Sequence, residues 1–301
     1  MRDYPPAWGT STGNARSGVA DEGDRRHAVS RQRPHPRTPP IVVVDDLIGR
    51  VEIRPDPQKP TVRLLDVAGH AYGAINLEDP TRLELDYLAR LKAVLDVLLP
   101  AGPAHIMHLG GGAFALPRAL AFRRPELMQV VVERSRHIIQ LAQRELGLRA
   151  EPALTVVHED ARAALDARAD ASVDAVVGDA FVGRETPRHL ATVEFVAEVA
   201  RVLHTRGVYV LNLIDAPPWS ALSAHAATVG AVLPHLLTVA APEVARLRDS
   251  GNMLLVASRH PLHRETIERR LAGSSRPVAL VAGGRLAALA RRSRPRHDAD
   301  G

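Results

Sequence analysis

The chain has 301 residues, 46% of them hydrophobic, so it can bury a full core and suits one main α/β domain with an appendage. It has no cysteine, which excludes disulfides, thiolate metal sites and a cysteine nucleophile. The formal charge of +5 lies at the two ends, where residues 1–40 hold seven Arg against four acids and residues 291–301 hold four against two. The main domain is thus neutral overall, which does not favour a nucleic-acid partner.

Membrane insertion is not expected either. No stretch approaches the roughly 18 apolar residues of a spanning helix, and the Arg-bearing N-terminus has no apolar signal core. We therefore expect a soluble, cytoplasmic protein without a membrane partner.

The N-terminal part divides into an arm and a β unit. Residues 1–40 are rich in Pro, Arg, Ser and Gly and lack apolar periodicity, which predicts a disordered arm. Residues 41–80 contain β-favouring runs separated by Pro, Asp and Gly, which predicts a small antiparallel β domain. The runs cover residues 41–44, 49–53 and 62–65.

A helix and an alternating α/β pattern follow. Asp79 is a candidate N-cap, Pro80 suits a first helical turn, and leucines keep helical spacing up to Pro100. Strands and helices then alternate, which predicts a mainly parallel, doubly wound sheet with helices on both faces. The predicted strands are 104–109, 127–133, 154–158, 173–178, 207–214, 235–240 and 252–258, and the predicted helices are 113–122, 135–146, 189–203 and 220–233.

The fold class predicted from this order is α/β, a Rossmann-like class I methyltransferase sheet preceded by a small N-terminal β unit. The expected parts are the arm 1–40, the β domain 41–80, a nucleoside-binding domain 81–273 and a C-terminal segment 274–301. We expect the basic end of that segment, after Arg291, to be disordered.

A Gly-rich turn and an acid point to a nucleoside. Gly110, Gly111 and Gly112 end the strand HIMHLGGG and precede a helix, so the backbone can approach a ligand at a helix N-terminus. A tight turn without a ligand would show the same glycines. Glu133 ends the next strand, about twenty residues later, where a carboxylate can accept hydrogen bonds from both ribose hydroxyls. The whole order favours a nucleoside site.

Two more acids follow the next strands. Asp160, in HEDA, can accept a hydrogen bond from an adenine amino group or cap the following helix, and the two roles are compatible. Asp179, in DAVVGDAF, ends a strand at the edge where ligands of open parallel sheets bind. It could position or deprotonate an amine, or only shape the loop.

Other chemistries are less favoured. His105 and His108 lie in or beside a predicted buried strand, and His260 with His263 has no nearby third ligand, so we expect no metal site. No Ser-His-Asp order, nucleophile elbow or Walker lysine is present.

Residues 41–260 resemble the spermidine synthase family, the polyamine aminopropyltransferases, especially its divergent bacterial members. The similar segments are LEDPTRLELDY, LGGGAF, VVVERS, HEDA and VVGDAF. The resemblance implies a homodimer, no prosthetic group, and decarboxylated S-adenosylmethionine as co-substrate for aminopropyl transfer to an amine such as putrescine. It also implies catalysis by Asp179 and donor binding by Gly110, Gly111, Gly112, Glu133, Asp160, Ala161 and Tyr87.

The chain departs from the family pattern on the acceptor side. Ala113 replaces the Asp that holds the donor amine, and Val182 replaces a second acid after Asp179. Leu88 and Ala89 replace the His and Glu that follow the family's Tyr, and Tyr72 stands near the place of a Gln.

Three functions therefore stay open. The first is aminopropyl transfer, with Asp179 accepting a proton from the attacking amine. The second is methyl transfer from S-adenosylmethionine, whose carboxylate could face the N–H groups of the Gly turn. The third is a non-catalytic nucleoside-binding homologue, because a fold alone does not guarantee activity.

Overall fold

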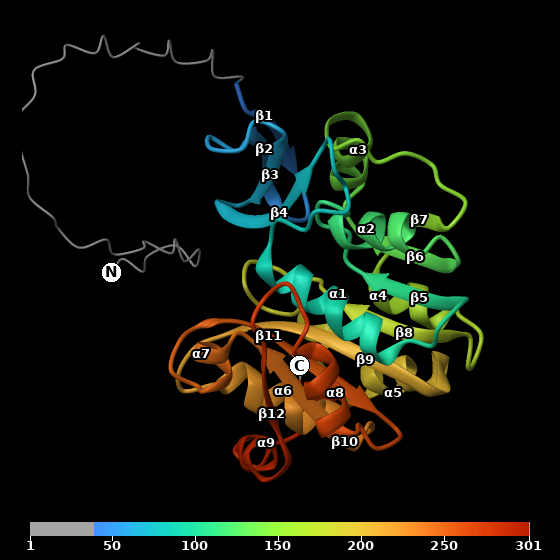
Figure 1. Cartoon of the computed structure of the whole chain (residues 1–301), viewed down its shortest axis with the longest axis vertical. Helices are drawn as coiled ribbons and strands as arrows, with labels where there is room; N and C mark the ends of the chain where they lie inside the picture. The colour runs from blue at the N-terminus through green and yellow to red at the C-terminus, as the bar shows by residue number, and fades with distance from the viewer. Residues whose placement is uncertain (1–38, 301) are drawn as a thin grey trace, which may run out of the picture. The chain divides into compact units, whose positions relative to one another are not determined.

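The structure, a computed structural model, describes residues 39–300 (Figure 1). The arm predicted for residues 1–40 lies outside the described residues, apart from its last two. The strands of residues 39–300 form a four-stranded sheet and an eight-stranded sheet. No helix of this part of the chain has the length and apolar character needed to cross a membrane.

The small sheet is an antiparallel meander in which each strand pairs with the next one along the chain. Its strands are β1 (Ile41–Asp45), β2 (Gly49–Pro55), β3 (Val62–Val67) and β4 (His70–Asn76). The first three were predicted. The fourth was missed because HAYGAIN has a glycine at its centre, and glycine weakens the strand signal.

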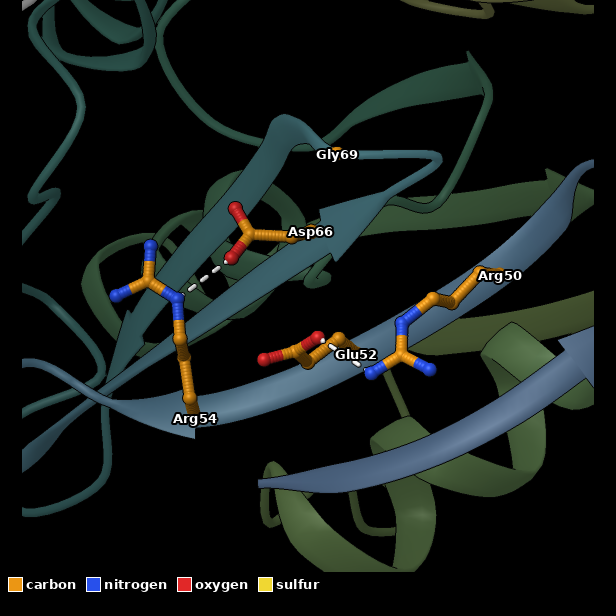
Figure 2. Close-up of a pocket in the computed structure, with 5 residues that line it drawn as sticks. All are labelled: Arg50, Glu52, Arg54, Asp66 and Gly69. Carbon is orange, nitrogen blue, oxygen red and sulfur yellow. Dashed lines mark hydrogen bonds and ion pairs between the residues drawn. The ribbon is translucent and has the colours of Figure 1, made fainter. Parts of the chain in front are cut away.

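The small sheet has a shallow hollow lined by Arg50, Glu52, Arg54, Asp66 and Gly69 (Figure 2). Arg50 pairs with Glu52 at 3.1 Å, and Nε of Arg54 pairs with Asp66 at 2.7 Å. The charges in the hollow therefore balance one another, and none of the predicted site residues lies there.

The large sheet has the order β12-β10-β11-β9-β8-β5-β6-β7, and five neighbouring strands, β5 to β9, are parallel. The remaining three pair antiparallel at one edge. The predicted doubly wound sheet is thus confirmed, and its order reverses between β5 and β8, where ligands of such sheets bind. The strands are β5 (Ala104–Leu109), β6 (Leu127–Glu133), β7 (Leu154–His158), β8 (Val173–Gly178), β9 (Leu203–Asp215), β10 (His235–Ala240), β11 (Gly251–Ser258) and β12 (Ala279–Ala282).

Helices pack on both faces of this sheet (Figure 1). Because side chains of a strand alternate, Ile106 belongs to one buried core and Met107 to the other. The first core includes residues of α1 (Asp86–Leu98), α2 (Ala115–Arg123), α3 (Arg136–Glu145) and α8 (Arg264–Leu271), together with the small sheet. The second includes residues of α4 (Ala161–Asp166), α5 (Val193–Val202), α6 (Ser220–Gly230), α7 (Pro242–Ala245) and α9 (Gly283–Ala290).

The connection from the small sheet to the large one corrects a predicted helix start. Helix α1 begins at Asp86, not at Pro80. Oδ1 of Asp79 accepts hydrogen bonds from the N–H and the hydroxyl of Thr81, at 3.0 and 2.6 Å, which holds a turn instead of a helix.

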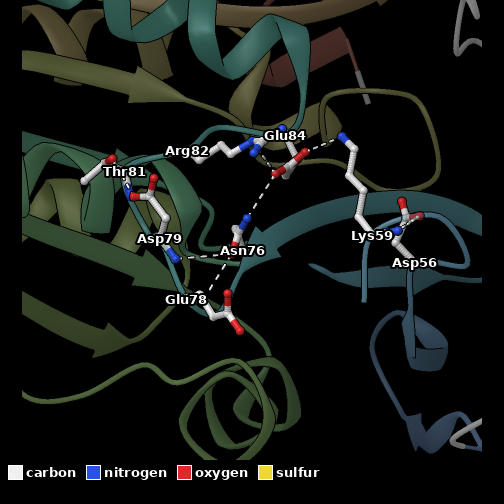
Figure 3. Close-up of polar contacts among 8 residues, drawn as sticks. All are labelled: Asp56, Lys59, Asn76, Glu78, Asp79, Thr81, Arg82 and Glu84. Carbon is white, nitrogen blue, oxygen red and sulfur yellow. Dashed lines mark hydrogen bonds and ion pairs between the residues drawn. The ribbon is translucent and has the colours of Figure 1, made fainter. Parts of the chain in front are cut away.

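Glu84 anchors this connection just before α1 (Figure 3). Its buried carboxylate lies 2.6 Å from Nζ of Lys59, in the β2–β3 loop, and 3.1 Å from Nε of Arg82. The amide of Asn76, at the end of β4, also donates to it at 3.4 Å. The small sheet is thereby attached to the start of the helix that carries Tyr87.

The C-terminal segment is ordered up to residue 300, so the disorder predicted after Arg291 is wrong. The N–H of Val193 donates to the carbonyl of Arg296 at 2.8 Å, and the N–H of Arg296 donates to Oγ1 of Thr228 at 3.0 Å. Asp298 forms an ion pair with Arg162 at 2.6 Å. These partners are distant in the sequence, so local composition could not indicate them. Strand β12, in this segment, pairs with β10 of the large sheet.

Candidate active site

The Gly turn lies where β5 ends, and it approaches other parts of the protein closely. Gly110 has a φ of +106°, and a Cβ there would lie 2.5 Å from the carbonyl oxygen of Asp179. The N–H of Gly110 donates to the carbonyl of Val132 at 2.9 Å, and that of Gly111 donates to Oε2 of Glu133 at 2.9 Å. We expected these glycines to face a ligand, but both N–H groups have protein partners. The glycines instead bring Glu133 and Asp179 beside one turn.

Phe114 is a feature of the turn that sequence reasoning missed. It precedes α2 with a φ of +55°, a left-handed conformation that costs a non-glycine residue about 1 kcal/mol. Its fully buried ring lies so close that a Cβ on Gly111 would be 2.6 Å from it. The sequence signal that could have indicated this residue was a phenylalanine directly after a run of small residues.

Glu133, at the end of β6, presents a carboxylate held at both oxygens. Oε2 accepts the N–H of Gly111 at 2.9 Å, and Oε1 accepts the N–H of Ser135 at 2.7 Å. Burial raises the pKa of Glu133, and hydrogen bonds from backbone N–H groups oppose that rise. Each oxygen keeps acceptor capacity, so the carboxylate can receive two further donors.

Asp160 is the N-cap of α4. Oδ1 accepts from the N–H groups of Arg162 and Ala163 at 2.9 and 3.4 Å, and Oδ2 lies 3.0 Å from Nε2 of His189. Burial pushes the pKa of Asp160 upward, but these hydrogen bonds outweigh it, and the net pKa is lowered. The structure therefore shows the capping role of Asp160. The methyl group of Ala161 is buried in the second core.

Asp179 follows β8 and forms the centre of a partly buried chain of polar side chains. Oδ2 accepts from the hydroxyl of Tyr87 at 3.1 Å, and Oδ1 accepts from Nδ2 of Asn212 at 2.7 Å. Oδ1 of Asn212 in turn accepts from Nδ2 of Asn252 at 3.2 Å. Burial raises the pKa of Asp179 to about 6, although the bonds from Asn212 and Tyr87 lower it. A carboxylate with a pKa just below neutrality suits a proton acceptor.

Neither asparagine was predicted. Asn212 lies in β9 and Asn252 in β11, two strands that pair antiparallel. A polar residue inside an apolar strand, as in VYVLNLI, was the signal that could have identified Asn212.

Tyr72 connects the small sheet to the loop after β8. Its hydroxyl donates to the carbonyl of Phe181. Burial raises the pKa of Tyr72, and the negative charges of Glu133 and Asp179 raise it further. Tyr72 and Tyr87 therefore both lie beside these acids. Tyr72 comes from the small sheet, and Tyr87 comes from α1.

Within residues 39–300, no cluster of three or more His, Asp or Glu side chains has the arrangement of a metal site.

Comparison with known proteins finds similarity to polyamine aminopropyltransferases and spermidine synthases. The chain is 32% identical over 112 residues to a polyamine aminopropyltransferase of Vibrio vulnificus (strain CMCP6); this region is 36% of the chain. The chain thus spans 38% of the length of the curated relative that it matches. A "probable spermidine synthase" from Corynebacterium glutamicum ATCC 13032 superposes with a TM-score of 0.76 and 26% identity, over 87% of this chain and 97% of that one. The chain is therefore similar to spermidine synthases in both sequence and fold.

More distant structures share the fold. The spermidine synthase of Thermotoga maritima has a TM-score of 0.60 at 16% identity, over 82% of each chain. Human methyltransferase-like protein 13, solved in complex with SAH, has a TM-score of 0.52 at 18% identity, over 71% of this chain and 96% of that one. No protein-family model matches the chain.

Positions at which the sequence differs from the spermidine synthase pattern carry apolar side chains in this chain. Leu88 and Ala113 are buried in the first core, with 6% and 4% exposure. A Cβ at Gly73 of β4 would lie 2.6 Å from that of Ala113, so β4 directly covers this position. Val182 is 55% exposed and forms an isolated β-bridge with Glu185.

Proposed function

We propose that the chain is an aminopropyltransferase-like enzyme that binds an S-adenosylmethionine-type donor beside the Gly turn and uses Asp179 as the proton acceptor. One observation carries this proposal. Asp179, with its pKa raised by burial, lies between Tyr87 and Asn212 and directly beside Gly110.

The donor's nucleoside would bind along the carboxyl ends of β5, β6 and β7. Glu133 would accept the two ribose hydroxyls, and Asp160 with Ala161 would meet the adenine edge. Gly110 to Gly112 would form the turn that lies beside the sulfonium group of the donor. Solved spermidine synthases of the same fold include one in complex with the transition-state analogue AdoDATO, with a TM-score of 0.59 at 15% identity. This supports an adenosyl ligand here.

The reaction would be a single displacement. The amine nitrogen attacks the donor methylene carbon bound to the sulfonium, a C–N bond forms, and the C–S bond breaks with its electron pair going to sulfur. Methylthioadenosine leaves, and the proton lost by the amine passes to Asp179 and then to solvent. Because the sulfonium is already activated, the protein supplies position and proton removal. Tyr87 and Asn212 hold the carboxylate in one orientation.

Methyl transfer is a second candidate, favoured by Ala113. Position 113 offers no carboxylate to a donor ammonium, and the nearby N-terminus of α2 favours an anion such as the carboxylate of S-adenosylmethionine.

Calorimetric titration tests whether the chain binds an S-adenosylmethionine-type donor. The ligands are decarboxylated S-adenosylmethionine, S-adenosylmethionine, methylthioadenosine and adenosylhomocysteine. We expect the native chain to bind methylthioadenosine, and Glu133→Gln to weaken binding about tenfold to a hundredfold through lost charged hydrogen bonds. Preference for the decarboxylated donor supports aminopropyl transfer, and preference for the carboxylated donor supports methyl transfer. If the native chain binds none of the four ligands, the proposal is wrong.

A further inference from the structure

Asp45 connects the small sheet to the start of α3. It is the last residue of β1, and its side chain is buried at 3% exposure. Oδ1 accepts from the N–H groups of Leu47 and Ile48 at 2.7 and 3.2 Å. Oδ2 accepts from the hydroxyl of Ser135 and lies 3.0 Å from Nδ1 of His137. Burial alone would raise the pKa of Asp45, but these four hydrogen bonds outweigh it, so the carboxylate stays charged.

Ser135 links Asp45 to the candidate site. As the N-cap of α3, its Oγ accepts the N–H of Ile138 at 3.0 Å, so its hydroxyl hydrogen is left to point at Asp45. Its own N–H donates to Oε1 of Glu133 at 2.7 Å. The serine is therefore fixed on one side by the small sheet and fixes Glu133 on the other.

The orientation of Glu133 depends on this N–H. Among the backbone donors to this carboxylate, Gly111 donates to Oε2 and Ser135 to Oε1, so the two N–H groups hold opposite oxygens. If Ser135 moved, Oε1 would lose the hydrogen bond from its N–H, and the carboxylate would be held less firmly against rotation about its last bond. Two neighbouring hydroxyls need both oxygens in one orientation to be bound together.

We propose that Asp45 is a positioning residue for the nucleoside site: through Ser135 it holds the Glu133 carboxylate in the orientation that accepts both hydroxyls of a ribose. This inference rests on the proposed binding of an adenosyl ligand. It gives the small sheet a part in donor recognition, because the β1–β2 hairpin supplies the carboxylate.

The test compares two probes, methylthioadenosine and the same nucleoside lacking both ribose hydroxyls, by calorimetry. The measured quantity is the ratio of their dissociation constants. Asp45→Asn keeps the shape but puts an N–H₂ group where Oδ2 accepts. Ser135→Ala removes the hydroxyl and keeps the N–H. The matched control is Asp66→Asn, which removes a carboxylate of the same small sheet that pairs with Arg54 (Figure 2).

We expect the native ratio to be about a hundredfold, from two charged hydrogen bonds. Asp45→Asn and Ser135→Ala should each reduce it about tenfold, mainly by weakening the parent nucleoside, and the double variant should reduce it no further. Asp66→Asn should keep the native ratio. A general loosening of the fold would weaken both probes equally and leave the ratio unchanged, so an unchanged ratio in the variants overturns the inference.

A failure of the proposed function would give a different result from a failure of this inference. If the native chain binds neither probe, or binds both equally, the ribose role of Glu133 is wrong and the inference falls with it. If Asp45→Asn does not fold, as judged by its thermal melting, Ser135→Ala carries the same test.

Discussion

The hydroxyl of Tyr87 lies 3.1 Å from Oδ2 of Asp179 and donates to it. Tyr87 is in α1, which follows the connection from the small sheet, whereas Asp179 follows a central strand of the large sheet. The contact therefore joins elements that are 92 residues apart in the sequence. Together with Asn212 on the other oxygen, it leaves Asp179 with a pKa of about 6, the net result of burial and two hydrogen bonds.

Removing the Tyr87 hydroxyl should raise the pKa of Asp179 further. A hydrogen bond to a charged group contributes about 1.5–3 kcal/mol, so we expect a rise of about one pKa unit in Tyr87→Phe. The acid limb of kcat/KM against pH, which we expect near 6 for the native chain, should move up by that amount. Tyr72→Phe is the control, because its hydroxyl donates to the carbonyl of Phe181. An unmoved limb in Tyr87→Phe would contradict the role of this contact.

Asp179→Asn should stabilise the fold at neutral pH. The folded pKa of about 6 lies above the unfolded value of about 3.9, so the folded state binds more protons between these pH values. Stability contributed by this group falls as pH rises from 4 to 6 and stays low above 6. At pH 7 the Asp179→Asn variant should avoid this loss of folding stability, which is on the order of 2 kcal/mol. At pH 4 it should be no more stable than the native chain. Thermal melting at the two pH values measures it, and a lower melting temperature than native at pH 7 would refute it.

Sequence periodicity predicted the large sheet well because its strands are short apolar runs between helices. Five predicted strands, those at 104–109, 127–133, 154–158, 173–178 and 235–240, have the observed bounds. β4 and the start of α1 were mispredicted for local reasons, a central glycine and an Asp79 turn. The ordered C-terminal segment could not be predicted, since its partners lie on α4, α5 and α6.

The candidate site was predictable only in part. The order of glycines and acids predicted that the Gly turn, Glu133 and Asp179 lie together, because the carboxyl ends of parallel strands meet at one edge. Contacts across the fold were not accessible to this reasoning. The bond from Asn212 to Asp179 joins neighbouring strands at a register that sequence does not give, and Asp45 reaches Ser135 across 90 residues.

Gly73→Ala should destabilise the chain and weaken donor binding. The added Cβ would lie 2.6 Å from the Cβ of Ala113 and 2.8 Å from its backbone nitrogen, so β4 or the Gly turn must shift. We expect a loss of about 1–3 kcal/mol, typical of overpacking. Gly284→Ala is the matched control, with no atom within 4 Å of its added methyl. Urea unfolding measures both, and equal stabilities for the two variants would show that β4 does not pack on the turn.

The C-terminal segment should be protected in hydrogen exchange. The amides of Val193 and Arg296 both donate hydrogen bonds in the contact between this segment and the main domain. Deleting residues 292–301 should remove the protection of Val193 while leaving amides inside β5 protected. Exchange of the Arg296 amide at the rate of an unfolded peptide would contradict the ordered segment.

The production of methylthioadenosine tests whether the chain transfers an aminopropyl group. Purified chain is mixed with decarboxylated S-adenosylmethionine and a panel of amines, and the nucleoside products are separated by chromatography. We expect methylthioadenosine from the native chain with at least one amine. For Asp179→Asn we expect a rate lower by about a hundredfold or more, as for the loss of a general base. No methylthioadenosine with any amine, from a chain that binds the donor, would contradict aminopropyl transfer.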